Sequence, residues 1–184
     1  MTTVFIGGSR AVSRLNDLIR AKLDDLMKRN CTVFIGDANG ADKAVQQHLA
    51  AGGYRHVVVF CMHECRNNLG GWPTRTIRTS GLRKDFAYYA AKDRAMAEEA
   101  KCGVMLWDGR SKGTLNNILN LIGAGKKTLV YFAPAKAFHK LSDEGDVRDL
   151  LTRCDKGHVE RVQQQLKAGM PPPLQQISLR PAQR

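Results

Sequence analysis

The sequence has no long apolar run, few cysteines and comparatively few acidic residues. No stretch approaches the ~20 consecutive apolar residues that a membrane-spanning helix needs. The first ten residues, MTTVFIGGSR, lack both the basic segment and the long apolar core of an export signal, and they read as a first strand. These absences argue against a membrane protein and against export. We therefore expect a globular protein of the cytoplasm with no membrane partner.

The cysteines are too few and too irregularly spaced for a disulfide framework. There are five in 184 residues, and without an export signal we expect their thiols to be reduced. Cys61, His63 and Cys65 lie close enough in sequence to raise a zinc site. Structural zinc usually has two ligand pairs, and no second pair of suitable spacing follows. We therefore predict neither a metal nor another cofactor.

Acidic residues are outnumbered by basic ones, 17 to 29, which gives a formal net charge of +12. Such an excess is typical of proteins that bind nucleic acid or phosphorylated small molecules, although it can also serve solubility alone. The excess is strongest from residue 66 to residue 94. That segment holds Arg66, Arg75, Arg78, Arg83, Lys84, Lys92 and Arg94 against Asp85 and Asp93. It is either a solvated face or part of a binding surface.

Short apolar runs alternate with segments of helical spacing over most of the chain. The strand-like runs are 3–7, 31–35, 56–61, 102–107 and 127–132, and the helical segments are 14–29, 41–53, 82–100 and 114–125. This alternation predicts an α/β fold, namely a Rossmann-like three-layer sandwich with a parallel sheet of about five strands. Residues 62–81 are polar, basic and rich in glycine, which predicts a long loop or lid.

The alternation stops at about residue 133, and the rest of the chain differs in character. Residues 146–154 and 158–169 have the pattern of two short helices, and the proline-rich end has the composition of a disordered tail. We therefore divide the chain into a Rossmann-like domain at 1–135, a short helical C-terminal appendage at 136–170, and a disordered tail at 171–184.

Four polar loops follow predicted strands, and in a parallel sheet the carboxyl ends of the strands form the ligand-binding edge. The loops are GGSR, GDANGAD, CMHECR and WDGRSKGT. Small residues let a ligand approach the backbone, and the free amides of a helix start attract anions. The ligand-binding residues that we predict from these loops are Gly7, Gly8, Ser9, Arg10, Gly36, Asp37, Gly40, Asp42, Gly109, Ser111, Lys112, Gly113 and Thr114.

Several of these residues also have an ordinary structural explanation. The pair Gly7-Gly8 can be a simple turn. Asp42 can favour the dipole of its helix or accept a hydrogen bond from a ribose hydroxyl. Asp108 can cap a turn, or it can act as a base or bind a sugar hydroxyl.

The motifs GGSR, GDANGAD, KDRAM and WDGRSKGT, in this order and spacing, resemble the SLOG superfamily, most closely its YspA-like branch of unknown function. Relatives include the LOG phosphoribohydrolases, which activate cytokinins, and the DNA-processing protein DprA. The resemblance covers about residues 3–132. It implies a Rossmann-like domain that binds a nucleotide or nucleotide-derived ligand through Gly7–Arg10, Gly36–Asp42 and Ser111–Thr114. It also implies a homodimer or higher homo-oligomer, which SLOG relatives often form.

Two positions depart from the LOG pattern. LOG enzymes carry a catalytic Glu three residues after the Thr of their G-T motif, and this chain has Asn117 there. An amide cannot stabilise an oxocarbenium ion by charge. The LOG arginine that precedes the helix Met is replaced by Lys92, so we add Lys92 and Asn117 to the predicted ligand-binding residues. If the chain is a hydrolase, the carboxylate must come from Asp93, Asp108 or Glu64, and we name Asp93 and Asp108 as catalytic candidates.

Three functions are compatible with these observations. The first is binding of a nucleotide or nucleotide sugar at the strand ends, with hydrolysis of an N-glycosidic bond as its activity. The second is a non-catalytic sensor of a nucleotide signal. The third is DNA binding of the DprA type through residues 66–94. Trp72 and one of Tyr88 and Tyr89 can stack on a base.

Overall fold

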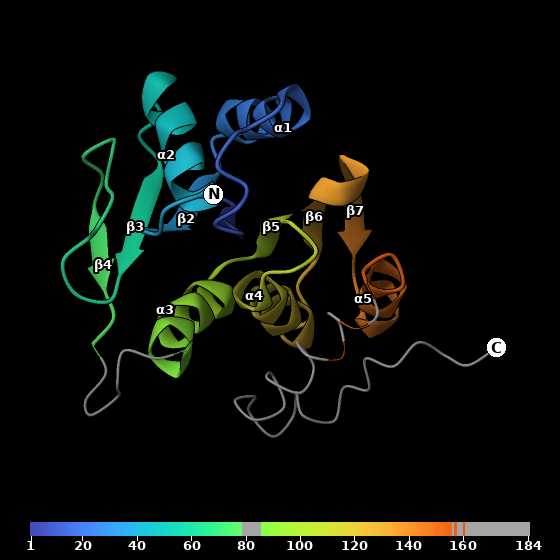
Figure 1. Cartoon of the computed structure of the whole chain (residues 1–184). Coiled ribbons are helices and arrows are strands. Elements are labelled where there is room, and N and C mark those ends of the chain that lie inside the picture. Colours follow the sequence, from blue (N-terminus) through green and yellow to red (C-terminus); the bar gives the residue numbers. More distant parts are fainter. Residues whose placement is uncertain (79–85, 156, 158–159, 161–184) are drawn as a thin grey trace.

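The computed structural model describes residues 1–78, 86–155, 157 and 160 (Figure 1). Within these residues, strands and helices alternate along the chain. They are β1 (Thr3–Gly8), α1 (Asp17–Lys28), β2 (Thr32–Gly36), α2 (Ala41–Ala51), β3 (Val57–Cys61), β4 (Thr74–Thr76), α3 (Phe86–Glu99), β5 (Cys102–Trp107), α4 (Lys112–Gly123), β6 (Thr128–Phe132), the 3₁₀ helix η1 (Ala133–Ala135), β7 (Ala137–Leu141) and α5 (Glu144–Leu151).

The strands form one sheet in the order β4-β3-β2-β1-β5-β6-β7. All neighbours pair in parallel except β6 and β7, which are antiparallel. The chain moves outward from β1 through β2, β3 and β4, and then returns to the other side of β1 as β5. This reversal between β1 and β5 is the position at which open α/β sheets usually bind ligands. The predicted Rossmann-like α/β fold is confirmed, with seven strands in place of about five.

Helices cover both faces of the sheet, with α1 and α2 on one face and α3, α4 and α5 on the other (Figure 1). Successive side chains of a strand point to opposite faces. In β1, Val4 and Ile6 therefore join the core beneath α1 and α2, whereas Phe5 joins the core beneath α3, α4 and α5. Because both faces are covered, the inner strands are apolar along their whole length, as the sequence indicates.

The first helix begins at a capped turn and buries one side. The Asn16 side chain accepts a hydrogen bond from the amide of Ile19, and Ile19, Leu23 and Leu26 lie in the core. The spacing of Leu15, Leu18, Ile19 and Leu23 in the sequence predicts that Leu18 shares this buried side, but Leu18 is 53% exposed, so that prediction is wrong.

Two edge strands were not expected from the sequence. The strand β4 lies inside the predicted loop 62–81 and adds to β3 with all three of its residues exposed. The strand β7 pairs with β6, and α5 packs Val147, Leu150 and Leu151 into the same core as α4. Residues 137–151 thus contribute a strand and a helix to the sheet and its core. The predicted helix at 158–169 and the tail at 171–184 fall outside the described residues, apart from residue 160.

No helix in the described part of the chain combines the length and apolarity that crossing a bilayer requires.

Candidate functional site

Four strands end at one edge of the sheet, which we call the strand-end rim. These strands are β1, β2, β3 and β5, and they end at Gly8, Gly36, Cys61 and Trp107. The loops that follow carry the predicted ligand-binding residues, and two of the glycines bring these loops together. A Cβ on Gly8 would lie 2.5 Å from the Leu106 carbonyl oxygen, and one on Gly40, whose φ is +85°, would lie 2.3 Å from the Cα of Arg10. These two positions require glycine, at Gly8 because β1 pairs with β5 there and at Gly40 because the loops after β1 and β2 contact each other.

Polar residues of the first and fourth loops form one hydrogen-bonded group, the Ser9 cluster, made of Ser9, Asp108, Ser111 and Thr114. The Ser9 hydroxyl donates to Asp108 Oδ1 over 2.9 Å and lies 3.1 Å from the Thr114 hydroxyl. Thr114 in turn donates to the Ser111 hydroxyl over 3.1 Å. Ser9 and Thr114 are buried, so this cluster joins the ends of β1 and β5 internally.

The carboxylate of Asp108 accepts hydrogen bonds from two backbone amides within the WDGRSKGT loop. Asp108 Oδ1 accepts from the amide of Arg110 over 2.9 Å and from that of Ser111 over 2.8 Å. Gly109 adopts a φ of +76°, which favours glycine in this turn. The Ser111 hydroxyl caps α4 by accepting from the amide of Thr114. Two amides of this loop, just before α4, are therefore already used by an anion of the protein itself.

A second group, the Asp37 cluster, joins Asp37, Asp42, Arg66, Lys92 and Asp93. Arg66 binds the buried Asp37 carboxylate through Nε at 3.0 Å and Nη2 at 2.8 Å, and its amide adds a third hydrogen bond. Lys92, on α3 and only 4% exposed, places Nζ 3.3 Å from Asp37 and 3.7 Å from Asp93. The cluster therefore gathers three carboxylates around one buried ammonium group, with Arg66 at its outer side.

Gly36, at the end of β2, packs against Asp42 and Lys92 of this cluster. A Cβ at Gly36 would come within 2.4 Å of Asp42 Oδ2 and 2.6 Å of Lys92 Nζ. The absence of a side chain at Gly36 therefore makes room for the carboxylate and the ammonium group. Asp42 also accepts a hydrogen bond from the amide of Ala38, so it ties the loop to the first turn of α2.

The carboxylates of the Asp37 cluster differ in acidity. Burial opposes the ionisation of Asp37, but the hydrogen bonds from Arg66 and the charge of Lys92 outweigh it and lower the pKa of Asp37 to about 2. Burial raises the pKa of Asp42 to about 6; the Lys92 charge opposes this rise, and the neighbouring carboxylates add to it. Burial alone would lower the pKa of Lys92, yet the carboxylates of Asp93, Asp42 and Asp37 raise it. Of Asp37, Asp42 and Lys92, Asp42 is thus the group whose pKa lies nearest to neutral pH.

The two catalytic candidates belong to different groups. Asp93 contacts Lys92 in the Asp37 cluster, whereas Asp108 is bound within the Ser9 cluster. Asn117 is buried on α4, three residues after Thr114, and its Oδ1 has no hydrogen-bond partner among the residues that the structure describes. Of the other predicted site residues, Arg10 is exposed, Lys112 is half-buried and Gly7 is buried. A Cβ on Gly113 would meet only the Ser111 hydroxyl, at 3.9 Å.

Three residues of the site, Arg66, Gln46 and Asn67, are not predicted individually from the sequence. Arg66 is named there only as part of the basic segment 66–94. Gln46 donates to the carbonyls of Gly36 and Asn67, and Asn67 donates to the carbonyl of Asp37 over 2.8 Å. These buried amides fix the loop that carries Arg66. The signal in the sequence is that Arg66 ends the polar loop CMHECR and Asn67 follows it; Gln46, on α2, has none.

The same loop contains a disulfide bond between Cys61 and Cys65, which corrects the expectation of reduced thiols for these two residues, whereas Cys31, Cys102 and Cys154 are free. Both sulfurs of the considered zinc site are thus bonded to each other. Among the described residues, no group of three or more His, Cys, Asp or Glu side chains is arranged to hold a metal ion.

Of the aromatic residues considered for base stacking, the structure describes the side chains of Trp72 and Tyr89, and Tyr89 lies on the surface. Trp72 is 6% exposed and its Nε1 donates to the Tyr54 carbonyl, so it packs in the interior and the expectation for Trp72 is wrong. The side chain of Tyr88 lies outside the described residues. Tyr89 is 36% exposed, and the guanidinium carbon of Arg66 lies 5.6 Å from its ring centroid.

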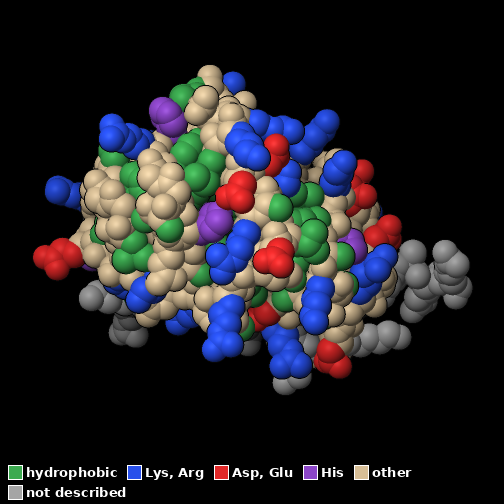
Figure 2. All heavy atoms as spheres, turned by 90° about the horizontal axis from the view of Figure 1, so that it is seen from above, with side chains coloured by type: hydrophobic (Ala, Val, Ile, Leu, Met, Phe, Trp, Pro, Cys, Tyr) green, Lys and Arg blue, Asp and Glu red, His purple; other side chains and the backbone are tan. Residues whose placement is uncertain are grey.

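The basic excess is not gathered in one patch on the face that carries α1 and α2. Figure 2 looks down on this face and shows Lys and Arg side chains spread over it, with Asp and Glu among them. On α1, for example, Lys22 and Arg29 both pair with Asp25. This face therefore offers no continuous track of positive charge.

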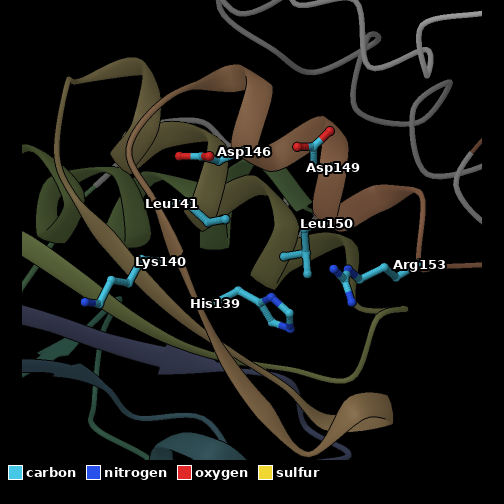
Figure 3. A pocket seen from close by; sticks show the side chains of 7 residues that line it. All are labelled: His139, Lys140, Leu141, Asp146, Asp149, Leu150 and Arg153. Atoms are coloured by element: carbon cyan, nitrogen blue, oxygen red, sulfur yellow. The ribbon is translucent and has the colours of Figure 1, made fainter.

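A small hollow of about 130 Å³ lies away from the predicted loops, between β7 and α5 (Figure 3). Asp146 and Asp149 extend into it from α5, and His139 extends into it from β7. The Nε2 atom of His139 is buried without a hydrogen-bond partner in the described part of the chain. None of the residues that line this hollow belongs to the strand-end rim.

Topology and loops define a Rossmann-like α/β domain with a polar strand-end rim. No family model and no curated protein matches the sequence. Among solved structures, the fold is similar to that of DNA processing protein A from Helicobacter pylori, a structure described for its mode of binding single-stranded DNA. The two chains are 14% identical with a TM-score of 0.51, over 91% of this chain and 81% of that one. The likeness supports the fold that the SLOG resemblance implies, while the YspA-like branch stays a prediction.

Proposed function

We propose that this chain binds single-stranded DNA across the strand-end rim. The observation that carries the proposal is the occupation of the rim amides by Asp108. A nucleotide phosphate that used the amides of Arg110 and Ser111, just before α4, would have to displace this carboxylate, whereas a polynucleotide can bind across the outside of the rim.

Exposed cations on two rim loops support this proposal. Arg10 and Arg110 follow β1 and β5, and both are exposed. Arg66, after β3, is exposed too, but its Nε and Nη2 atoms donate to Asp37. Arginine binds phosphate through a planar fork of donors, and several such contacts give most of the affinity for a nucleic acid backbone. The single-stranded DNA binding of the structurally similar protein is consistent with the same use of the fold.

The test is the binding of a fluorescent oligothymidine of about 30 nucleotides, followed by anisotropy at about 50 and 200 mM salt. We expect affinity to fall steeply with salt. The double variant Arg10→Glu/Arg110→Glu should weaken binding and flatten the salt dependence, since each lost phosphate contact lowers the slope by about 1.

The matched control is Lys28→Glu/Arg55→Glu, which changes the net charge equally at two exposed positions. These residues lie just before β2 and β3, at the opposite edge of the sheet. Equal weakening by both double variants would show that total charge, and not the rim, attracts DNA. An absence of oligonucleotide binding would overturn the proposal.

A second candidate function is binding of a nucleotide or nucleotide sugar, with N-glycosidic hydrolysis or signal sensing as its purpose. The observation in its favour is Asp42, a buried carboxyl with a pKa of about 6 beside Lys92, which can hold or release a proton near neutral pH. A thermal-shift screen of nucleotides on the wild type and Thr114→Val tests it. A ligand at ~100 times its Kd should stabilise the protein by about 2.7 kcal/mol. A selective shift that Thr114→Val abolishes would favour this candidate, and released base would then identify the hydrolase.

Homo-oligomerisation, a cytoplasmic location and the division of the chain near residue 135 also stay proposals.

A further inference from the structure

Tyr89 and Arg66 form an exposed pair of flat groups next to the strand-end rim. Tyr89 lies on α3 and is 36% exposed, while Arg66 lies in the loop after β3 with its side chain 43% exposed. The guanidinium carbon is 5.6 Å from the ring centroid, within the range of a cation–π interaction. An aromatic ring and an arginine are thus presented together at the surface.

The arginine of this pair is held in place by the interior. Arg66 has two side-chain hydrogen bonds to Asp37, and Asp37 is itself fixed by Lys92. The preceding residue, Cys65, is bonded to Cys61 at the end of β3. A side chain fixed in this way loses little conformational freedom when a ligand arrives, so the pair is prepared for binding.

The chemistry of the pair suits an unpaired nucleobase. Aromatic rings and guanidinium planes stack on bases, and stacking is tolerant of sequence because every base has a flat face. In a duplex these faces are covered by neighbouring base pairs. A stacking position beside a phosphate-binding rim therefore distinguishes single strands from duplexes, which charge alone does not.

Resting on the function proposed above, we propose that Tyr89, supported by Arg66, is a stacking position for one unpaired base and makes the rim selective for single-stranded DNA. The Arg66 guanidinium lies over the ring, so the base would stack on the opposite face, and the guanidinium brings positive charge close to the adjoining phosphate. The rim cations attract the strand, and the Tyr89 ring recognises that its bases are unpaired.

The experiment is a double-mutant cycle in which one change is made in the protein and the other in the DNA. Wild type and Tyr89→Ala are titrated with oligothymidine and with an abasic oligonucleotide of equal length, which keeps the phosphates and lacks the bases. We expect wild type to bind the abasic strand about tenfold more weakly, the size typical of one lost base–aromatic stack. Tyr89→Ala should lose about the same factor on oligothymidine and show no further loss on the abasic strand.

Two control variants separate stacking from other effects. Tyr89→Phe keeps the ring and should bind like wild type. Leu18→Ala removes an exposed apolar side chain on α1 and should change neither titration. Circular dichroism of each variant confirms that the fold is kept.

The outcomes separate this inference from the proposed function. If wild type binds both strands equally well, or if Tyr89→Ala weakens both by the same factor, the stacking position is overturned while DNA binding by the rim stands. If wild type binds no oligonucleotide, the proposed function fails and the stacking position fails with it.

Discussion

Arg66 holds the buried carboxylate of Asp37 through two side-chain hydrogen bonds, of 3.0 and 2.8 Å. This link joins the loop after β3 to the loop after β2. Because Arg66 also lies over Tyr89, the same side chain connects the interior of the rim to its surface.

The first prediction concerns this link. Arg66→Ala leaves Asp37 buried with Lys92 as its remaining cationic partner, so we expect the free energy of unfolding to fall by about 1–2 kcal/mol in urea titrations. This cost is below the about 3–5 kcal/mol of a fully buried pair because Arg66 is partly exposed. Arg29→Ala, which breaks an exposed pair with Asp25, should cost no more than about 0.5 kcal/mol. Equal costs would contradict the special role of Arg66.

The second prediction concerns pH and Asp42. The folded state raises the pKa of this carboxyl from 3.8 to about 6, so it binds the proton more tightly than the unfolded chain does. The stability that this proton contributes is fully present below about pH 4 and is lost as the pH rises through about 6. A shift of this size corresponds to up to about 3 kcal/mol.

Asp37 acts in the opposite direction. Its pKa is lowered to about 2, so its contribution is present above about pH 4 and is lost as the pH falls toward 2. Urea unfolding at about pH 5 and about pH 7.5 should therefore isolate Asp42. The variant Asp42→Asn should remove the decrease in stability between these two pH values, and an unchanged decrease would show that another group causes it.

The third prediction concerns Gly40. This residue has a φ of +85° and meets the Arg10 backbone, so Gly40→Ala adds both backbone strain and a collision between two loops. We expect a loss of more than about 2 kcal/mol. Gly53 provides the control, because its φ is +64° and its Cβ would meet open space. Gly53→Ala should cost about 1 kcal/mol, and a similar cost for both variants would contradict the close approach of the loops.

The fourth prediction concerns Asp108. The variant Asp108→Ala frees the amides of Arg110 and Ser111, so we expect it to be less stable and to gain affinity for inorganic phosphate. Thermal shift with added phosphate measures the gain, and potassium chloride at equal ionic strength is the control. Equal stabilisation of the variant and the wild type by phosphate would mean that Asp108 does not occupy an anion site.

The inner strands and the position of the rim could be predicted from the sequence, because strands covered on both faces are continuously apolar and parallel strands end at one edge. The edge strands could not. The strand β4 has the sequence Thr-Arg-Thr and is exposed. The strand β7 lies at the other edge of the sheet and pairs with β6 alone. Neither edge strand has the continuous apolar run by which the inner strands are recognised.

The predicted loops contain most of the residues in the two clusters. Which of these residues pair with one another within each cluster could not be predicted from the sequence. Asp37 is 29 residues from Arg66 and 55 from Lys92, and only the folded geometry of α3 brings all three together. The sequence is compatible with Asp108 as a base or as a turn cap. Its hydrogen bonds from the amides of Arg110 and Ser111 are those of a turn cap, and its third comes from the Ser9 hydroxyl.

The bond between Cys61 and Cys65 closes a small covalent ring at the end of β3, and Arg66 is the first residue outside that ring. The chemical surroundings of the protein therefore affect how firmly the rim is built. In an oxidising medium the Arg66 loop is anchored covalently to the sheet, whereas in a medium rich in thiols it is held by hydrogen bonds alone. Samples prepared with and without reductant carry the same sequence but differ in how rigidly they present Arg66 and Tyr89 to a partner.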